Sequence, residues 1–155
     1  VSSESGPDAN STKLAMLNLE SGKITIIPDS QSKGGAFWPS QRLIVAGGEQ
    51  DRLYAFDMNT HKWSVLADGP IDNWMISPDS QYLYFVREIP GNPQAMRIHL
   101  ADRKSEPVAS LQGLRRLSDP SSQGGSWLGV APDGSILLTR DVGTQEVYAL
   151  DVKWP

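Results

Sequence analysis

The residues that could catalyse a reaction are few, and they do not form a known catalytic set. A serine hydrolase needs a nucleophilic serine, a histidine base and an orienting acid, and the serine often stands in a G-x-S-x-G turn. The nearest match is "GGSWLG" at 124–129, where Leu128 occupies the position of the final glycine. His61 and His99 could supply the base, but we expect them on the surface or packed between sheets. We therefore predict no catalytic residue.

Ligands for metals and phosphates are equally sparse. The chain has no cysteine, and its two histidines are 38 positions apart, which does not make a zinc cluster. The segment "DVGTQE" at 141–146 lacks the dense alternating oxygen ligands of a strong calcium site. The "SGK" at 21–23 is typical of a hairpin turn and not of a Walker loop. We expect neither a metal nor a cofactor.

Four aspartates stand at repeated positions, which favours a structural role over catalysis. Asp79 and Asp133 follow turn prolines, where an Asp side chain can cap its own turn. Asp57 and Asp151 end the equivalent segments "AFD" and "ALD". We expect these two carboxylates to accept hydrogen bonds from the backbone of the turn that follows.

Arg115 and Arg116 form an adjacent basic pair within "GLRRLSDPSSQGG" at 113–125. The simple interpretation is a solvated loop. The alternative is a contact with an anion or a partner, because binding residues concentrate on loops that a rigid scaffold holds. Arg115 and Arg116 are therefore the candidate partner-binding residues.

An internal repeat indicates which elements position these residues. Aligned on Pro39, Pro78 and Pro132, three segments match, namely "GGAFWPSQRLIVAGG", "DNWMISPDSQYLYFV" and "SWLGVAPDGSILLTR". A second unit of strand, polar turn and strand follows each, and the chain start supplies a fourth copy, "LAMLNLESGKITIIPDS". Each copy therefore reads as short strands bracketed by Gly- and Pro-containing turns.

The spacing of the repeat predicts the fold class. Pro39 and Pro78 are 39 residues apart, and Phe56 lies 42 residues before its equivalent, Ile98. The next step, to Leu150, is 52 residues, which implies an insertion near 113–125. A repeat unit of about 40 residues with four short strands is typical of a β-propeller blade. We predict an all-β, partial propeller of four-stranded antiparallel blades.

The composition agrees with packed blades. Apolar residues make up 39% of the 155 and charged residues 21%, which is close to the globular norm. The middle strands are apolar on both faces, as expected for a sheet lying between two others. We expect the inter-blade wedges to be filled by tryptophans, namely Trp38, Trp63, Trp74 and Trp127.

Charge and hydropathy exclude other classes. The net charge is −4 and there is no Lys/Arg run, so we expect no nucleic-acid partner. No apolar run approaches the roughly 18 residues of a membrane span.

The motifs "SPDSQYLYF" and "APDGSILLT" resemble the W-S-P-D-G signature of TolB-like, WD-repeat-like bacterial propellers. Ile76 and Val130 replace the signature tryptophan, and "FWPSQRL" lacks the Asp-Gly turn. The tail "WLGVAPDGSILLTRDVGTQEVYALDVKWP" resembles the C-terminal end of propellers attached to winged-helix transcriptional regulators or serine/threonine kinases. The resemblance implies a bacterial protein of the periplasm or cytoplasm and a sensor or interaction module.

The repeats divide one partial propeller domain, residues 1–155, into about three and a half blades. We place these at 12–30, 33–68, 70–110 and 124–153, after a flexible start at 1–11. An open arc leaves sheet edges and an inter-blade face uncovered. We therefore expect the C-terminal part of a larger protein, whose exposed edges a second copy or another partner covers.

These inferences favour a non-enzymatic propeller module that binds a protein or senses a ligand on its face or at its channel, within a larger bacterial signalling or regulatory protein. The alternative is the accessory propeller of a prolyl-oligopeptidase-type hydrolase whose catalytic domain lies outside this chain. A third option is a lyase or hydrolase propeller with a metal in its channel.

Overall fold

The computed structural model describes residues 13–40, 42–116 and 127–144, with the side chains of residues 35–39 excepted. These residues form antiparallel strands joined by short turns, with a single 3-10 turn at Glu49–Asp51 and no α-helix among them. Within the described ranges no helix is long and apolar enough to cross a membrane. The expected flexible start at 1–11 lies outside them.

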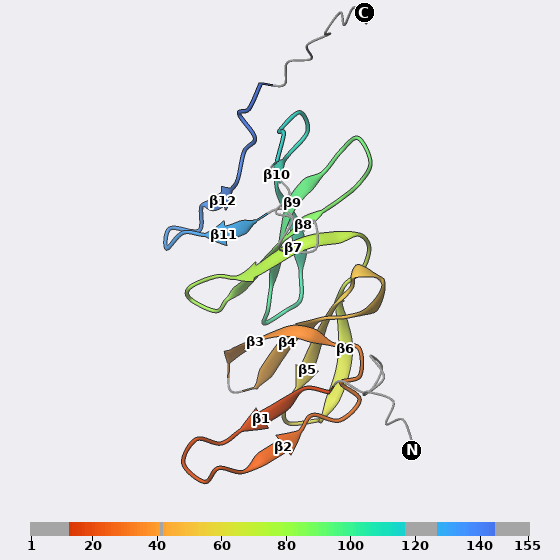
Figure 1. The fold of residues 1–155 in the computed structure, drawn as a ribbon, viewed down its shortest axis with the longest axis vertical. Helices are drawn as coiled ribbons and strands as arrows, with labels where there is room; N and C mark the ends of the chain where they lie inside the picture. The colour runs from red at the N-terminus through yellow and green to blue at the C-terminus, as the bar shows by residue number, and fades with distance from the viewer. Residues whose placement is uncertain (1–12, 41, 117–126, 145–155) are drawn as a thin grey trace, which may run out of the picture.

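Four antiparallel sheets follow one another along the chain and along the long axis of the molecule (Figure 1). A hairpin comes first, two four-stranded sheets follow, and a second hairpin comes last. The strands are β1 (Ala15–Leu17) and β2 (Ile24–Ile26); β3 (Gly34–Ser40), β4 (Leu43–Gly47), β5 (Leu53–Asp57) and β6 (Lys62–Ala67); β7 (Ile71–Ile76), β8 (Tyr82–Arg87), β9 (Gln94–His99) and β10 (Ser105–Ser110); β11 (Leu128–Val130) and β12 (Ile136–Leu138).

Each four-stranded sheet is a simple meander, in the orders β3-β4-β5-β6 and β7-β8-β9-β10. The strand registers repeat between the two sheets. Ile44 on β4 pairs with Phe56 on β5, and Leu83 on β8 pairs with Ile98 on β9. These four residues hold equivalent positions in the sequence repeat, so one pairing pattern is used twice.

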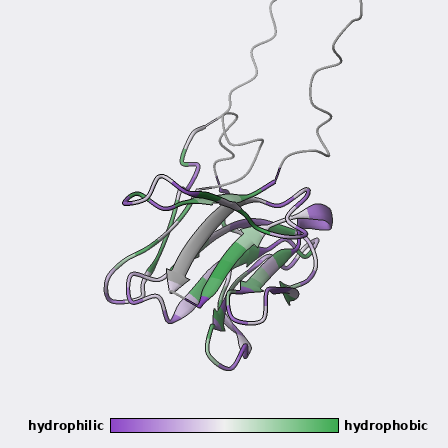
Figure 2. Cartoon of the chain, turned by 90° about the horizontal axis from the view of Figure 1, so that it is seen from below, coloured by the Kyte–Doolittle hydropathy of each residue, from purple (hydrophilic) through white to green (hydrophobic). Residues whose placement is uncertain are grey.

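The middle strands are buried on both faces, as the sequence predicts. Ile44, Val45 and Ala46 are consecutive and all buried, and so is the run Leu83–Val86 on β8. A strand with one face in solvent would alternate buried and exposed residues instead. Figure 2 shows the resulting concentration of hydrophobic residues along the central strands, with hydrophilic residues in the turns around them.

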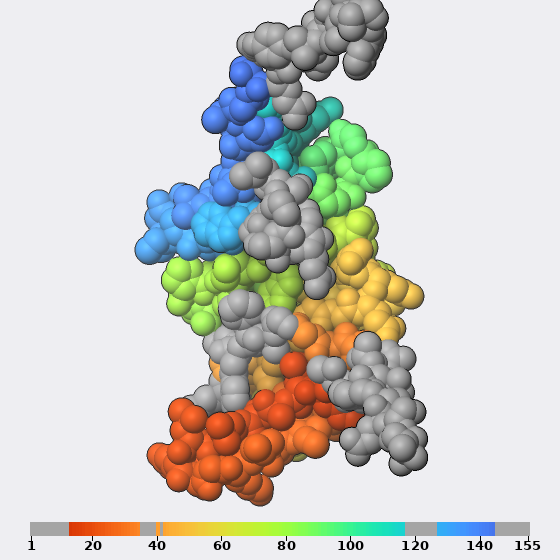
Figure 3. All heavy atoms as spheres, viewed as in Figure 1, coloured from red at the N-terminus to blue at the C-terminus, as the bar shows by residue number. Residues whose placement is uncertain are grey.

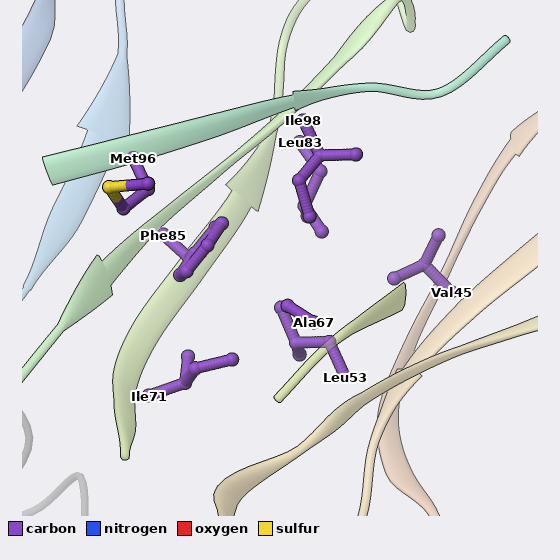
Figure 4. Packing of buried hydrophobic residues seen from close by; sticks show 8 residues of the cluster. All are labelled: Val45, Leu53, Ala67, Ile71, Leu83, Phe85, Met96 and Ile98. Atoms are coloured by element: carbon purple, nitrogen blue, oxygen red, sulfur yellow. The ribbon is translucent and has the colours of Figure 1, made fainter. Parts of the chain in front are cut away.

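The main hydrophobic core lies between the two four-stranded sheets (Figure 4). Val45, Leu53 and Ala67 from the first sheet pack against residues of the second, namely Ile71, Leu83, Phe85, Met96 and Ile98. A second core joins the β7–β10 sheet to β11–β12, and a third joins the β1–β2 hairpin to the β3–β6 sheet. The sheets therefore stack face to face, and Figure 3 shows the chain passing from one end of the molecule to the other in sequence order.

Two of the tryptophans pack between sheets as predicted. Trp63 contacts the core beneath the β1–β2 hairpin, and its indole N–H donates to the Pro28 carbonyl at 2.8 Å. Trp74 packs against the main core. The prediction is wrong for Trp127, which is 49% exposed and whose ring lies over Gly129. The Trp38 side chain lies outside the described part of the chain.

Large apolar side chains are exposed at the two ends of the stack. The hairpin carries Leu17, Leu19, Ile24 and Ile26, each more than half exposed, and the other end carries Leu137 and Val142. The expected cover by a second copy or another partner stays a prediction.

Candidate functional site

A groove of about 570 Å³ lies between the two four-stranded sheets. It lies at the end where β3 turns into β4, β5 into β6, β7 into β8 and β9 into β10. We call it the inter-sheet groove. Its lining residues are Ser40, Arg42, Leu43, Asp57, Ser80, Gln81, His99, Leu100, Ala101 and Arg103.

Asp57 is held by the turn that follows β5. Its Oδ1 accepts hydrogen bonds from the Asn59 and Thr60 backbone N–H groups at 2.9 and 3.0 Å. These bonds, Thr60 first, hold the pKa of the Asp57 carboxyl below its usual range, and Arg42 adds to them. The predicted turn-capping role of Asp57 is confirmed, and its carboxylate stays ionised at the groove wall.

Asp79 and Asp133 also cap their own turns, as predicted. Asp79 Oδ1 accepts from the Ser77 hydroxyl at 2.6 Å and from the Gln81 N–H at 3.0 Å. Asp133 Oδ1 accepts from the Ser135 N–H at 2.9 Å. In each case a hydrogen bond from the neighbouring serine is the main cause that lowers the carboxyl pKa. Asp151 lies outside the described residues.

His99 occupies the position in the second sheet that Asp57 occupies in the first. Its Nδ1 lies 2.9 Å from Asp102 Oδ1, and its ring centroid is 5.1 Å from that of Tyr82. The His99 hydrogen bond is the main cause that lowers the pKa of the Asp102 carboxyl. Asp102 Oδ1 also accepts from the Lys104 N–H at 3.2 Å, so here the capping carboxylate stands three residues later than in the first sheet.

The two histidines lie in different surroundings. His61 is exposed in the β5–β6 turn with φ of 55°, and His99 is partly buried beside Tyr82. Among the described residues neither histidine hydrogen-bonds a serine hydroxyl. The residues 124–126 of "GGSWLG" lie outside the described ranges.

Arg115 and Arg116 are placed very differently, although they are adjacent. Arg116 has a side chain only 13% exposed and forms ion pairs with Asp72, at 3.4 Å, and with Glu88. Arg115 is 59% exposed and pairs with Asp141 at 3.0 Å. Arg116 therefore ties its segment to the β7–β10 sheet, whereas Arg115 faces solvent. A partner contact by this loop stays a prediction.

The segment 141–146, which we considered and did not favour as a calcium site, is only partly described. Asp141 pairs with Arg115 and accepts a hydrogen bond from the Gly143 N–H at 2.8 Å, while residues 145 and 146 lie outside the described part. Over the described ranges there is no group of three His, Cys, Asp or Glu side chains that could hold a metal ion.

Sequence reasoning missed the polar residues that line the inter-sheet groove, notably Arg42, Gln81 and Arg103. Arg42 and Gln81 follow the turn proline by three positions in successive copies, and Arg103 is equivalent to His61 and Gly22. At these equivalent turn positions the residue type differs from copy to copy, whereas the neighbouring Pro and Asp recur. This difference is the signal that could have identified the groove residues.

By sequence, no protein-family model and no curated protein matches this chain. Solved structures do match. The chain is similar to TolB from Acinetobacter baumannii at TM-score 0.59 and 18% identity, covering 84% of this chain and 32% of that one. It is similar to an oligogalacturonate lyase in complex with manganese at TM-score 0.61 and 12% identity, covering 88% and 44%. The tricorn protease matches at TM-score 0.56 and 14% identity, covering 81% and 12%.

These similarities establish the fold class. The chain is a partial β-propeller, in which each complete four-stranded sheet is one blade, and the fold prediction is confirmed. TolB is among the propellers that it resembles in structure. The chain spans less than half the length of each of the three similar structures.

Proposed function

We propose that this chain is a non-enzymatic β-propeller module that binds a protein partner or a small ligand, within a larger bacterial signalling or regulatory protein. The observation that carries the proposal is the inter-sheet groove. Its volume of about 570 Å³ falls in the range of roughly 300–1,000 Å³ that is usual for ligand sites.

The groove is built as binding sites commonly are, with variable polar side chains on turns that a rigid scaffold holds. Turn residues from both blades line it, and the strands behind them carry the main hydrophobic core. Strand pairing and burial therefore keep the two walls in place, which reduces the entropy lost when a ligand binds.

A screen for binding tests the proposal. Backbone amide NMR shifts should be followed while a library of small polar molecules and short peptides is added to the chain. Saturable shifts confined to the four turns around the groove would support a binding module. Saturable shifts confined to other surfaces would contradict the assignment of this groove.

The accessory-propeller alternative places its catalytic domain outside this chain, so an in-frame hydrolase domain in the complete reading frame would favour it. Catalysis by the chain itself is tested in the same samples. Peptide and ester substrates should stay intact over hours, because the proposed module binds without turning its ligand over. Steady turnover that tracks the purified chain would favour an enzyme. One structurally similar protein is a protease by name, but at 14% identity this similarity supports only the propeller fold.

A further inference from the structure

Two arginines from different blades line the inter-sheet groove of a chain whose net charge is −4. Arg42 follows the β3–β4 turn of the first blade, and Arg103 stands in the β9–β10 turn of the second. Asp57 is the acidic residue among those lining the groove. The lining therefore carries one net positive charge, opposite in sign to the molecule.

Arg42 is loosely held. Its Nε and Nη2 both lie 3.3 Å from Asp57 Oδ2, which is long for a charge-assisted hydrogen bond, usually about 2.7–2.9 Å. The Arg42 side chain is 72% exposed, and exposed ion pairs of this kind contribute little. The two turn hydrogen bonds of Asp57 use its other oxygen, Oδ1, so they do not depend on the contact with Arg42. Arg42 can therefore leave Asp57 and bind a ligand at a small cost in free energy.

Arg103 occupies a backbone position that favours glycine. Its φ is 60°, and the equivalent residue in the first hairpin is Gly22, with φ of 67°. A long side chain kept in this left-handed region is held against its conformational preference. Arg103 Nη1 donates to Ser64 Oγ on the first blade at 2.7 Å, so the side chain crosses from one blade to the other. Among the described residues its Nε and Nη2 make no hydrogen bond.

We propose that the inter-sheet groove binds a carboxylate between Arg42 and Arg103, with the polar remainder of the ligand over Ser40, Ser80 and Gln81. The inference rests on the proposed binding function and specifies its ligand class. The carboxylate can belong to a free small acid or to an acidic side chain of a peptide, since the guanidinium recognises the same group in both.

The charges in the groove favour a monoanion over a phosphate dianion. Two guanidiniums and the Asp57 carboxylate leave one positive charge to be balanced, and Asp57 repels a second negative charge. The planar fork of a guanidinium also matches the two oxygens of a carboxylate. A singly charged carboxylate therefore fits both the charge and the geometry of this pair.

The first test compares matched acids and amides on the unmodified chain. N-acetylglycine and N-acetylglycinamide represent free small molecules, while acetyl-Gly-Glu-Gly-amide and its Gln counterpart represent peptides. Calorimetry gives the affinity, and NMR of the arginine Nε–H groups reports on Arg42 and Arg103. We expect at least one acid to bind saturably and shift both signals, and its amide to bind about tenfold more weakly or worse.

Variants then assign the site. Arg42→Gln and Arg103→Gln should each weaken binding of that acid about tenfold. Asp57→Asn should tighten it several-fold, because it removes the repelling charge while Asn can still cap the turn, as Asn18 does in the first hairpin. Lys23→Gln is the control for the two arginine variants, because it also removes one positive charge but lies in the turn of the first hairpin. It should leave the affinity unchanged.

The outcomes separate this inference from the proposed function. Equal binding of acids and amides, or undiminished acid binding by both arginine variants, overturns the carboxylate assignment and leaves a binding module. Failure of every acid to bind overturns it too, whatever the library screen finds. The comparison of wild-type binding to acid and amide remains decisive even if an arginine variant does not fold.

Discussion

At the scale of the residue, the repeated turns show how few side chains fix the backbone. Ser77 is 6% exposed and joins three groups. Its hydroxyl accepts from the Tyr82 N–H at 2.9 Å and donates to Asp79 Oδ1 at 2.6 Å, while its own N–H donates to the Tyr82 carbonyl. Ser77 therefore closes the β7–β8 turn from both ends.

We predict that Ser77→Ala lowers the free energy of unfolding by about 1–3 kcal/mol, because it leaves the partly buried Tyr82 N–H without its acceptor. Urea denaturation checks the value. Ser110→Ala is the matched control, since Ser110 is exposed and its hydroxyl only accepts a long bond of 3.3 Å from the Gln112 N–H. Equal effects of the two substitutions would contradict the role assigned to Ser77.

At the scale of the element, one hairpin turn is made twice with different residues. Ser80 in the β7–β8 turn and Gly134 in the β11–β12 turn hold equivalent positions, with φ of 58° and 84°. Ser80 adopts a region that costs an L-residue about 1 kcal/mol, whereas Gly134 adopts it freely. The same hairpin therefore forms with and without glycine, because pairing of the flanking strands determines its shape.

We predict that Gly134→Ala lowers the free energy of unfolding by about 1 kcal/mol through backbone strain. The space around Gly134 does not oppose the change, since an added Cβ would meet only the Tyr84 hydroxyl, at 3.5 Å. Ser80→Gly, the reciprocal change, should be neutral or slightly stabilising. Thermal unfolding of the two variants checks the contrast, and a stabilised Gly134→Ala protein would refute the strain argument.

At the scale of the whole molecule, stability depends on carboxylates that the turns keep ionised. The pKa values of Asp57, Asp79, Asp102 and Asp133 are all lowered in the folded chain, chiefly by hydrogen bonds. A carboxyl whose pKa is lower folded than unfolded stabilises the fold above its unfolded pKa, about 3.9 for Asp. That contribution is lost as the pH falls through the folded pKa.

We therefore predict a melting temperature that is nearly constant from pH 7 to about pH 5 and that falls steeply below about pH 4. Thermal unfolding at a series of pH values checks the window. Replacing Asp79 and Asp133 by Asn should flatten the fall, since these turns then carry no titrating group. Glu20→Gln, on an exposed turn of the first hairpin, is the control. An unchanged slope in the Asp variants would show that other groups control acid unfolding.

The sequence by itself determined the fold class. Three features indicate it: the period of about 40 residues, the Pro-Asp turns, and middle strands that are apolar on both faces. The turns and the strand patterns can be recognised from the sequence because they depend on residues that are adjacent in the chain. The capping roles of Asp57, Asp79 and Asp133 followed from the same local chemistry. So did the packing of Trp63 and Trp74 between sheets.

Only the tertiary structure decided which polar side chains meet. Arg42 and Arg103 are distant in the chain and belong to different blades, so no spacing rule connects them. They line one groove because the two sheets stack with the same ends aligned. Arg116, predicted as a candidate partner contact, is only 13% exposed and pairs with Asp72 on β7 and with Glu88 just after β8. Side-chain encounters across a blade interface depend on how whole sheets pack, and that packing is not encoded in any single repeat.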